Sequence, residues 1–179
     1  MAKDRDFIPL RIAVLTVSDT RTTADDKSGQ TLQDRIVGAG HSVTSRQIVR
    51  DDVPDIRAVV EAWCVRADVD VIISTGGTGL TGRDVTIEAM RPLFEKEIEG
   101  FGTLFHMVSF KKIGTSTVQS RATAGVKRGK YIFCLPGSPG ACKDAWDEIL
   151  KFQLDYRHHP CNFVEIMPRL EEHQKRGKG

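Results

Sequence analysis

With 179 residues, of which 40% are apolar and 28% charged, the chain has the composition of one globular domain with a substantial core. Lys and Arg outnumber Asp and Glu by only 26 to 24, which argues against a nucleic-acid partner, and no apolar run approaches the ~18 residues that span a bilayer. Four scattered cysteines, at positions 64, 134, 142 and 161, form no C-x-x-C pair, so we expect free thiols in a cytoplasmic protein.

Three apolar runs in the first half of the chain predict strands, at residues 12–17, 43–49 and 69–73. Between them, apolar stripes at helical spacing predict helices at residues 28–38 and 54–66. The first run is unbroken, as in a strand of a parallel sheet that is covered on both faces. This alternation predicts right-handed crossovers, with the carboxyl ends of the strands on one edge of the sheet.

Two helices are predicted after the third strand. The first runs over residues 87–94, with Pro92 as its kink or stop, and the second over residues 101–112. On the second helix we expect four side chains to face inward, namely Leu104, Phe105, Val108 and Ile113. The hydroxyl-rich run 115–121 that follows indicates by its composition no more than a surface loop.

A hairpin and a helix complete the predicted domain. Residues 122–126 and 131–135 flank the basic turn at 127–130, which predicts a β-hairpin, and residues 141–150 predict an amphipathic helix. The hairpin adds one antiparallel strand. The expected fold is therefore a three-layer α/β domain, with a mostly parallel sheet and helices on both faces.

The carboxyl-terminal region has weaker patterns. His158, His159 and Cys161 could bind a metal, but no partner spacing supports a zinc site, and we favour a structural or interface segment. We place the domain at residues 8–165 and a polar tail at residues 166–179. From Glu171 onward we expect disorder.

The most informative stretch is the loop at residues 75–84, which follows the third strand. Four of the seven residues from 76 to 82 are glycines, which reach positive φ freely and let a ligand approach the backbone. Threonines add hydroxyls, and a helix begins at Thr86, where free N–H groups attract anions. A tight connection without a ligand is the simpler alternative, but the position at a strand's carboxyl end favours a phosphate site.

Two known phosphate motifs do not account for this loop. Residues 77–82 match G-x-G-x-x-G, but the acid expected about 20 residues later falls in a charged segment instead of after a strand. A P-loop would end in Gly-Lys-Ser or Gly-Lys-Thr, where this chain has Gly82-Arg83-Asp84. The loop is therefore a phosphate candidate of another kind.

Three polar loops should meet at the carboxyl edge of the sheet: Ser18–Asp19, residues 75–84 and residues 136–140. Asp51 and Asp84 bring carboxylates to the same edge. These would repel phosphate unless they hold Mg²⁺ against it or accept hydrogen bonds from a ligand ring. Plain solvation at the surface is the alternative for each of these polar residues.

Seven short motifs, found in order along residues 8–165, carry a resemblance to a known family. The motifs are Thr16–Asp19, Asp26–Gly29, Ser74–Gly79, Arg83–Thr86, Glu99–Gly102, Ser120–Arg121 and Leu135–Pro139. With them the chain resembles the molybdenum-cofactor biosynthesis proteins of the MoaB and MogA type, related to the N-terminal domain of gephyrin. The ending around Arg157 and Pro160–Phe163 is similar to the MoaB branch.

The resemblance implies a molybdopterin-binding fold that assembles as a homo-trimer or hexamer and works with other proteins of the cofactor pathway. It also implies an adenylyltransferase with ATP and molybdopterin as substrates and Mg²⁺ as cofactor. In that reaction the molybdopterin phosphate attacks the α-phosphorus of ATP, and pyrophosphate leaves. Backbone amides, Mg²⁺ and an arginine would neutralise the charge that such a transfer builds up.

Site residues follow from the same resemblance, position by position. Asp51 and Asp84 match two functionally important aspartates of the family, and one of them would hold Mg²⁺. The nucleotide would be lined by Thr75, Gly76, Gly77, Thr78, Gly79, Pro136, Gly137, Ser138 and Pro139. The pterin would contact Ser18, Asp19, Arg83, Ser120 and Arg121.

Two other functions remain open at this point. The chain could be a pterin-binding or scaffolding oligomer of the same pathway without transferase activity, which predicts pterin binding but no consumption of ATP. A generic nucleotide-binding domain, like the related one in competence-damage proteins, is a third possibility. The extra enzymatic domain of those proteins has no room in this chain.

Overall fold

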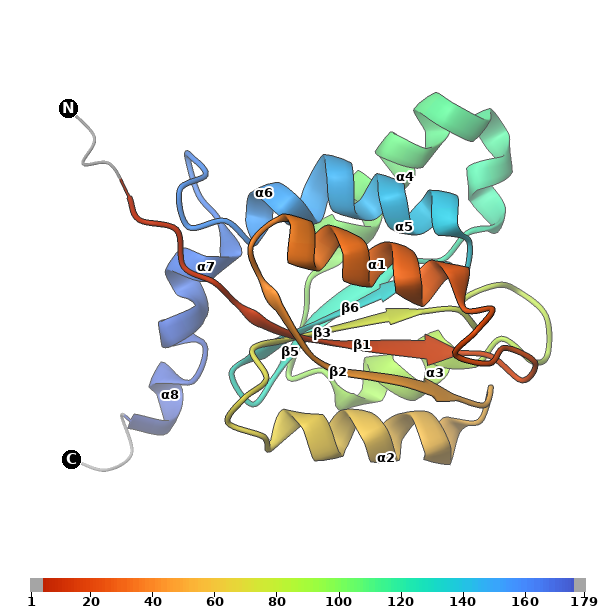
Figure 1. Ribbon diagram of the computed structural model, residues 1–179, viewed down its shortest axis with the longest axis horizontal. Coiled ribbons are helices and arrows are strands. Elements are labelled where there is room, and N and C mark those ends of the chain that lie inside the picture. The colour runs from red at the N-terminus through yellow and green to blue at the C-terminus, as the bar shows by residue number, and fades with distance from the viewer. Residues whose placement is uncertain (1–4, 176–179) are drawn as a thin grey trace.

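The computed structural model describes residues 5–175, which form a three-layer α/β structure around one six-stranded sheet (Figure 1). The strand order is β2-β1-β3-β6-β5-β4. Strands β2, β1, β3 and β6 are parallel, whereas β5 runs antiparallel to both of its neighbours. The strands are β1 (Arg11–Val17), β2 (Ser42–Val49), β3 (Val71–Thr75), β4 (Lys96–Glu97), β5 (Thr123–Lys127) and β6 (Lys130–Leu135). The predicted fold class is confirmed.

Helices cover both faces of the sheet, and Figure 1 shows α1, α4 and α5 on one face with α2 and α3 on the other. The helices are α1 (Lys27–Gly38), α2 (Val53–Cys64), α3 (Thr86–Met90), α4 (Glu99–Ile113), α5 (Pro139–Ala145), α6 (Lys151–Gln153), α7 (Phe163–Ile166) and α8 (Glu172–Lys175). A π-helical segment, Trp146–Leu150, joins α5 to α6, and 3₁₀ turns lie at Arg91–Leu93, Gly114–Gln119 and Met167–Arg169.

Alternation along the strands divides the core into two clusters. In β1, Ile12 and Val14 face the α1 and α5 side, while Ala13 and Leu15 face α2, and all four are fully buried. Successive side chains of a strand point to opposite faces of the sheet, so a strand that is covered twice must be apolar at every position. This is the physical reason for the unbroken apolar run in the sequence.

The strands end in register at the edge that carries the candidate loops. Val17 pairs with Val49, Thr16 with Thr75, and Thr75 with Leu135. The chain therefore leaves four neighbouring parallel strands at nearly the same level.

Helix α4 corrects one expectation. Phe105 is buried and Val108 packs against the core, as predicted, but Leu104 and Ile113 are 42% and 52% exposed. Because Phe101 and Phe105, one turn apart, set the buried face, Leu104 lies about 100° away from it. The prediction was wrong for Leu104 and Ile113 because α4 is apolar on two faces, and only one of them meets the sheet.

The carboxyl-terminal segment also departs from expectation. Met167 and Leu170 pack against the core, inside the part predicted to be a polar tail. The predicted disorder is wrong for residues 172–175, which form α8; residues 176–179 lie outside the described residues. Near His158 and Cys161, Asn162 caps α7, accepting from the Glu165 amide and donating to the His158 carbonyl.

Two absences apply to residues 5–175. No helix there combines the length and apolar composition that a membrane crossing requires. All four cysteines are free thiols, and three of them are buried.

Candidate functional site

The predicted loops meet through direct packing of their backbones. Gly76 has a φ of +99°, and a Cβ placed on it would lie 2.2 Å from the carbonyl oxygen of Val17. A Cβ on Gly137 would lie 3.0 Å from the Gly76 Cα, and the Gly76 amide donates to the Leu135 carbonyl at 3.1 Å. Glycine is required where the ends of β1, β3 and β6 close together. The predicted convergence of the loops is confirmed.

Gly77 brings the loop backbone against Asp51. Its φ is +64°, and a Cβ there would lie 2.4 Å from Thr86 Oγ1 and 2.6 Å from Asp51 Oδ1. Thr86 holds the loop through two hydrogen bonds: its amide donates to the Gly77 carbonyl at 2.9 Å and its hydroxyl to the Gly76 carbonyl at 2.7 Å. The first amide of α3, expected to attract an anion, is therefore used inside the protein.

Asp19, Asp51 and Arg83 form a charged cluster beside the loop. Arg83 Nε donates to Asp19 Oδ2 at 2.9 Å, and the Asp51 amide donates to Asp19 Oδ1 at 3.2 Å. The Arg83 hydrogen bond lowers the pKa of Asp19, whereas burial and then the charge of Asp19 raise the pKa of Asp51. Among Asp19, Asp51 and Asp84, Asp51 has a raised pKa whereas the other two have lowered ones, so Asp51 is the one suited to bind a cation or to accept from a substrate donor.

Asp84 shapes the second half of the loop. The Thr81 amide and hydroxyl donate to Asp84 Oδ2 at 2.9 and 2.6 Å, and the hydroxyl bond is the main reason why the pKa of Asp84 is lowered. A Cβ on Gly79 would lie 2.7 Å from the same oxygen. Asp84 therefore has a structural role in addition to presenting a carboxylate.

Arg121 clamps the loop from the opposite side. Its Nε donates to the Thr78 carbonyl at 2.8 Å and its Nη2 to the Gly79 carbonyl at 2.7 Å. Its Nη1 donates to Glu88 Oε1 at 2.5 Å, which links the clamp to α3. All three nitrogens of this guanidinium contact the protein, so Arg121 positions the loop.

The loop at residues 136–140 is held by hydrogen bonds to its own and neighbouring residues. Thr75 is fully buried, and its hydroxyl donates to the Pro136 carbonyl at 2.9 Å. Thr78 is also buried. Ser138 is the N-cap of α5 and accepts from the Ala141 amide at 3.1 Å. The loop backbones, and not these threonine side chains, are what the edge offers to a ligand.

Asp26 anchors the start of α1 beneath the edge. It is 2% exposed, caps α1 through the Gly29 amide at 2.9 Å, and accepts from Thr16 Oγ1 at 2.8 Å. Arg46 Nη2 donates to the same carboxylate at 3.0 Å. A buried charge with this many donors is stable only while all of them are present. The Asp26–Gly29 motif therefore has a structural explanation.

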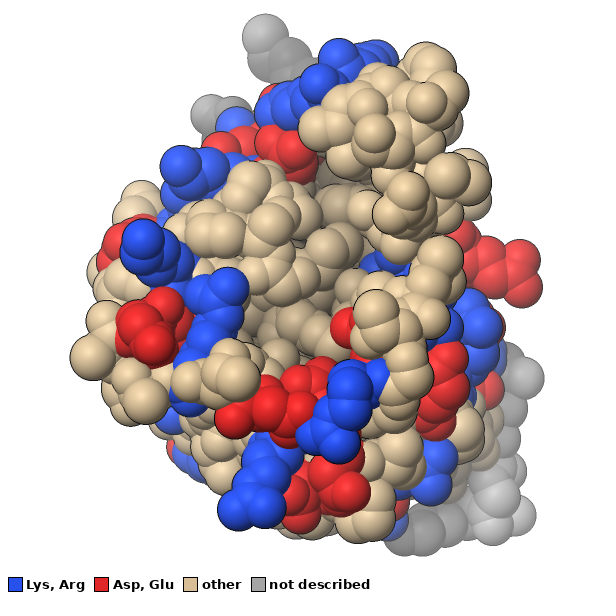
Figure 2. Space-filling view, turned by 90° about the vertical axis from the view of Figure 1, so that its right-hand side faces the viewer, with Lys and Arg blue, Asp and Glu red and all other residues tan. Residues whose placement is uncertain are grey.

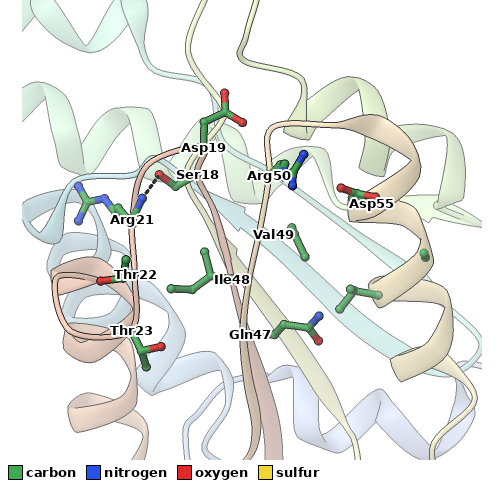
Figure 3. Close-up of a pocket in the computed structure, with 12 residues that line it drawn as sticks. Ser18, Asp19, Arg21, Thr22, Thr23, Gln47, Ile48, Val49, Arg50 and Asp55 are labelled. Carbon is green, nitrogen blue, oxygen red and sulfur yellow. Dashed lines mark hydrogen bonds between the residues drawn. The ribbon is translucent and has the colours of Figure 1, made fainter.

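The largest cavity at this edge lies beside Asp19 and measures about 630 Å³. Figure 3 shows side chains from the loop after β1, from β2 and from α2 around it, with Arg50 and Asp55 across from Arg21 and Thr22. Ser18 also lines it, and accepts from the Arg21 amide at 3.2 Å. Most of the residues that line it are polar or charged, and Ile48, Val49, Ala58 and Val59 are the apolar part of its wall.

A second cavity of about 310 Å³ lies on the other side of the loop and is lined by Ser120 and Arg121. The five predicted pterin residues therefore divide into two groups, with Ser18, Asp19 and its partner Arg83 on one side of the glycine loop and Ser120 and Arg121 on the other. Figure 2 looks onto this edge and shows an uncharged hollow with acidic and basic side chains gathered along one side.

Four contributors to the site went unpredicted. Asp26 and Thr86 were noted only as motif or helix-start residues, and Glu88 and His106 carried no expectation of a contact with the site. The capping position of Asp26, three residues before Gly29, was the one local signal available. Glu88 and His106 act through contacts with residues 120 and 121, which are distant in the chain.

Within residues 5–175, no group of three or more His, Cys, Asp or Glu side chains is placed to hold a metal ion. A cation at this edge would therefore need ligands from a bound substrate or from water. Mg²⁺ commonly binds in this way, with one or two carboxylates and substrate phosphates. Asp51, whose pKa is raised, and Asp84 fit that donor set.

The fold and the converging loops define an open-sheet α/β domain with a candidate ligand site at the carboxyl edge of its strands. A family model described as "Probable molybdopterin binding domain" matches residues 13–156. The chain belongs to this family, that of the MoaB and MogA proteins.

Individual relatives agree with this placement. The chain is 53% identical to molybdenum cofactor biosynthesis protein B of Escherichia coli (strain K12) over 158 residues, which are 88% of this chain and 93% of that one. It is 44% identical to the Bacillus subtilis (strain 168) protein of the same name over 142 residues, 79% and 84% of the two chains.

Solved structures agree as well. A crystal structure of molybdenum cofactor biosynthesis protein B has a TM-score of 0.85 at 41% identity and covers 94% of this chain and 99% of that one. The tungsten cofactor synthesizing protein MoaB from Pyrococcus furiosus has a TM-score of 0.69 at 36% identity, covering 79% and 91%.

Proposed function

We propose that this protein acts in molybdenum cofactor biosynthesis by adenylylating molybdopterin with ATP. A phosphate oxygen of molybdopterin forms a bond to the α-phosphorus of ATP. The bond from that phosphorus to the oxygen that bridges the α- and β-phosphates breaks. Pyrophosphate leaves, and adenylyl-molybdopterin remains. No covalent enzyme intermediate and no nucleophilic side chain are required.

One observation carries this proposal: the Asp51 carboxylate lies against the backbone of Gly77, in the loop that also holds Asp84. Phosphoryl-type transfer depends mainly on positioned phosphates and on compensation of their charge. A main-chain loop that a ligand can approach closely, with a poorly compensated acid beside it, supplies the position and a place for the compensating cation.

The cation proposed here is Mg²⁺, held by Asp51 or Asp84 together with phosphate oxygens and water. When bound, it would neutralise negative charge on the phosphates and on departing pyrophosphate. Arg83 is suited to assist, since its side chain is 73% exposed and bonded to Asp19 at the rim. Arg121 is proposed to hold the loop in place.

Pyrophosphate release by the purified protein tests the proposal. We expect release from ATP only when molybdopterin and Mg²⁺ are both present, and we expect EDTA to stop it, because the phosphates would then lack a counter-ion. Release that is independent of molybdopterin would indicate hydrolysis of ATP to AMP and pyrophosphate, with water as the acceptor, and would contradict this function. A coupled phosphate assay and mass detection of the adenylylated product provide the measurement.

The alternative is a molybdopterin-binding protein of the same pathway without transferase activity. It predicts that isothermal titration detects molybdopterin but not ATP, whereas the transferase binds both. The larger cavity favours pterin binding in either case, because hydrogen-bonding groups from three elements line it.

We further propose that the chain forms homo-oligomers through α4. Leu104, Met107, Phe110 and Ile113 are between 42% and 58% exposed on this helix, and an apolar stripe of this kind marks interaction surfaces. Sedimentation velocity is expected to show a species larger than one chain, and Phe110→Glu is expected to reduce its size. Glu61→Gln, at an exposed position of α2, is the control. A monomer at micromolar concentration would contradict the proposal.

A further inference from the structure

The ring of His106 lies between two carbonyl oxygens. In the middle of α4, its Nδ1 is 2.7 Å from the Gly102 carbonyl oxygen and its Nε2 is 2.8 Å from the Ser120 carbonyl oxygen. Both oxygens are acceptors that carry no hydrogen. The ring thus connects α4 to the segment that leads into β5.

Each ring nitrogen lies within hydrogen-bonding distance of a carbonyl oxygen, so the ring is held at both of its polar atoms. We infer that His106 is a positioning residue of the candidate site, whose ring bridges α4 and the segment that carries Arg121.

The contact with Ser120 bears directly on the glycine loop. The Ser120 carbonyl belongs to the peptide bond that continues into Arg121, so holding it fixes the backbone from which Arg121 extends. Arg121 in turn donates to the carbonyls of Thr78 and Gly79. His106 therefore lies at the start of a chain of contacts that ends at the loop proposed to hold the nucleotide.

Several charged groups surround the ring. Arg91 and Arg121 line the same small cavity, and Lys111 lines the apolar groove on the other side of the ring. Arg91 is paired with Glu97 at 2.9 Å, and Arg121 with Glu88 at 2.5 Å. The two glutamates therefore offset the charges of the two arginines.

The remaining neighbours of the ring are uncharged. They are Thr103 and Phe105 on α4, Thr117 in the 3₁₀ turn, Ile87 on α3, and Ala122 and Thr123 at the start of β5. The two carbonyl oxygens are the hydrogen-bond partners of the ring.

This inference rests on the proposed function only in taking residues 76–84 as part of a substrate site. The measurements below need no substrate, so their failure and the failure of the transferase assay are distinguishable.

Hydrogen exchange of the backbone amides at residues 76–84 tests positioning. His106→Leu removes both ring contacts and is expected to speed exchange there about tenfold, while amides of β1 and β3 serve as an internal control. His106→Arg supplies several N–H groups that can donate to the same carbonyl oxygens and is expected to restore the wild-type rate. Unchanged exchange in the leucine variant, or no recovery with arginine at equal melting temperature, would contradict the positioning role.

Discussion

An Asp51→Asn variant is expected to release pyrophosphate at least about a hundredfold more slowly than the wild type, while keeping its fold. Asparagine has nearly the same shape but no charge, so it cannot hold a cation against phosphate as a carboxylate does. A hundredfold loss corresponds to about 2.7 kcal/mol of transition-state stabilisation, a typical size for one electrostatic group in an active site. Stopped assays of pyrophosphate at saturating ATP measure it.

Asp52→Asn is the matched control for this variant. Asp52 is the exposed neighbour of Asp51 and caps α2 by accepting from the Asp55 amide at 3.2 Å. Asparagine caps a helix about as well as aspartate, so stability and activity should both be retained. Full activity in Asp51→Asn, or equal loss in both variants, would remove the role assigned to Asp51.

The Asp51→Asn substitution is also expected to change stability in a pH-dependent way. Burial, followed by the charges of Asp19 and Asp84, raises the folded-state pKa of Asp51 above its ordinary value of 3.8. The folded protein therefore holds this proton more tightly than the unfolded chain, and stability falls as pH rises from 3.8 through the raised pKa. Asp51→Asn should melt at a higher temperature than wild type at pH 7, and the difference should vanish in acid.

A Gly76→Ala variant is expected to lose about 3 kcal/mol or more of its free energy of unfolding. The φ of Gly76 is +99°, and the added Cβ would lie 2.2 Å from the carbonyl oxygen of Val17. Positive φ costs a non-glycine residue about 1–2 kcal/mol, and overpacking typically costs a further 1–3 kcal/mol. Backbone must move to relieve the overlap, because the atom that blocks the Cβ is not part of a side chain.

Gly82→Ala in the same loop is the control. Nothing lies within 4 Å of a Cβ at this position. Its unfolding midpoint in urea should match that of the wild type, or exceed it slightly because alanine restricts the unfolded chain. Equal midpoints for Gly76→Ala and Gly82→Ala would show that the crossing of β1 and the glycine loop is not rigid.

The central strands were predictable because burial on both faces requires an unbroken run of apolar residues in the sequence. Ile12 and Ile72 are fully buried, and runs of such residues admit few other interpretations. Strand β4 has no such apolar pattern, since Lys96 and Glu97 are both exposed and join the sheet through backbone pairing and a hydrogen bond from Thr123 to Glu97. Helix α4 was placed correctly, but periodicity does not say which of two apolar faces meets the sheet.

The candidate site shows the same division. Glycines after a buried strand indicated the loop, and parallel topology indicated which loops meet, because both signals are local. The partners of Arg121 could not be read in this way. Its acceptors at Thr78 and Gly79 lie 43 and 42 residues away in the chain, and a single arginine in a hydroxyl-rich run has no distinguishing composition. The resemblance implies a pterin contact for Arg121, and the structure shows that Arg121 also contacts the glycine loop.

The interlocked glycines have an evolutionary consequence. At Gly76, Gly77 and Gly137 a side chain would overlap neighbouring atoms, so the shape of this edge depends mainly on the absence of side chains. Related proteins could therefore bind different ligands by exchanging the residues around these glycines, while the glycines themselves tolerate almost no change.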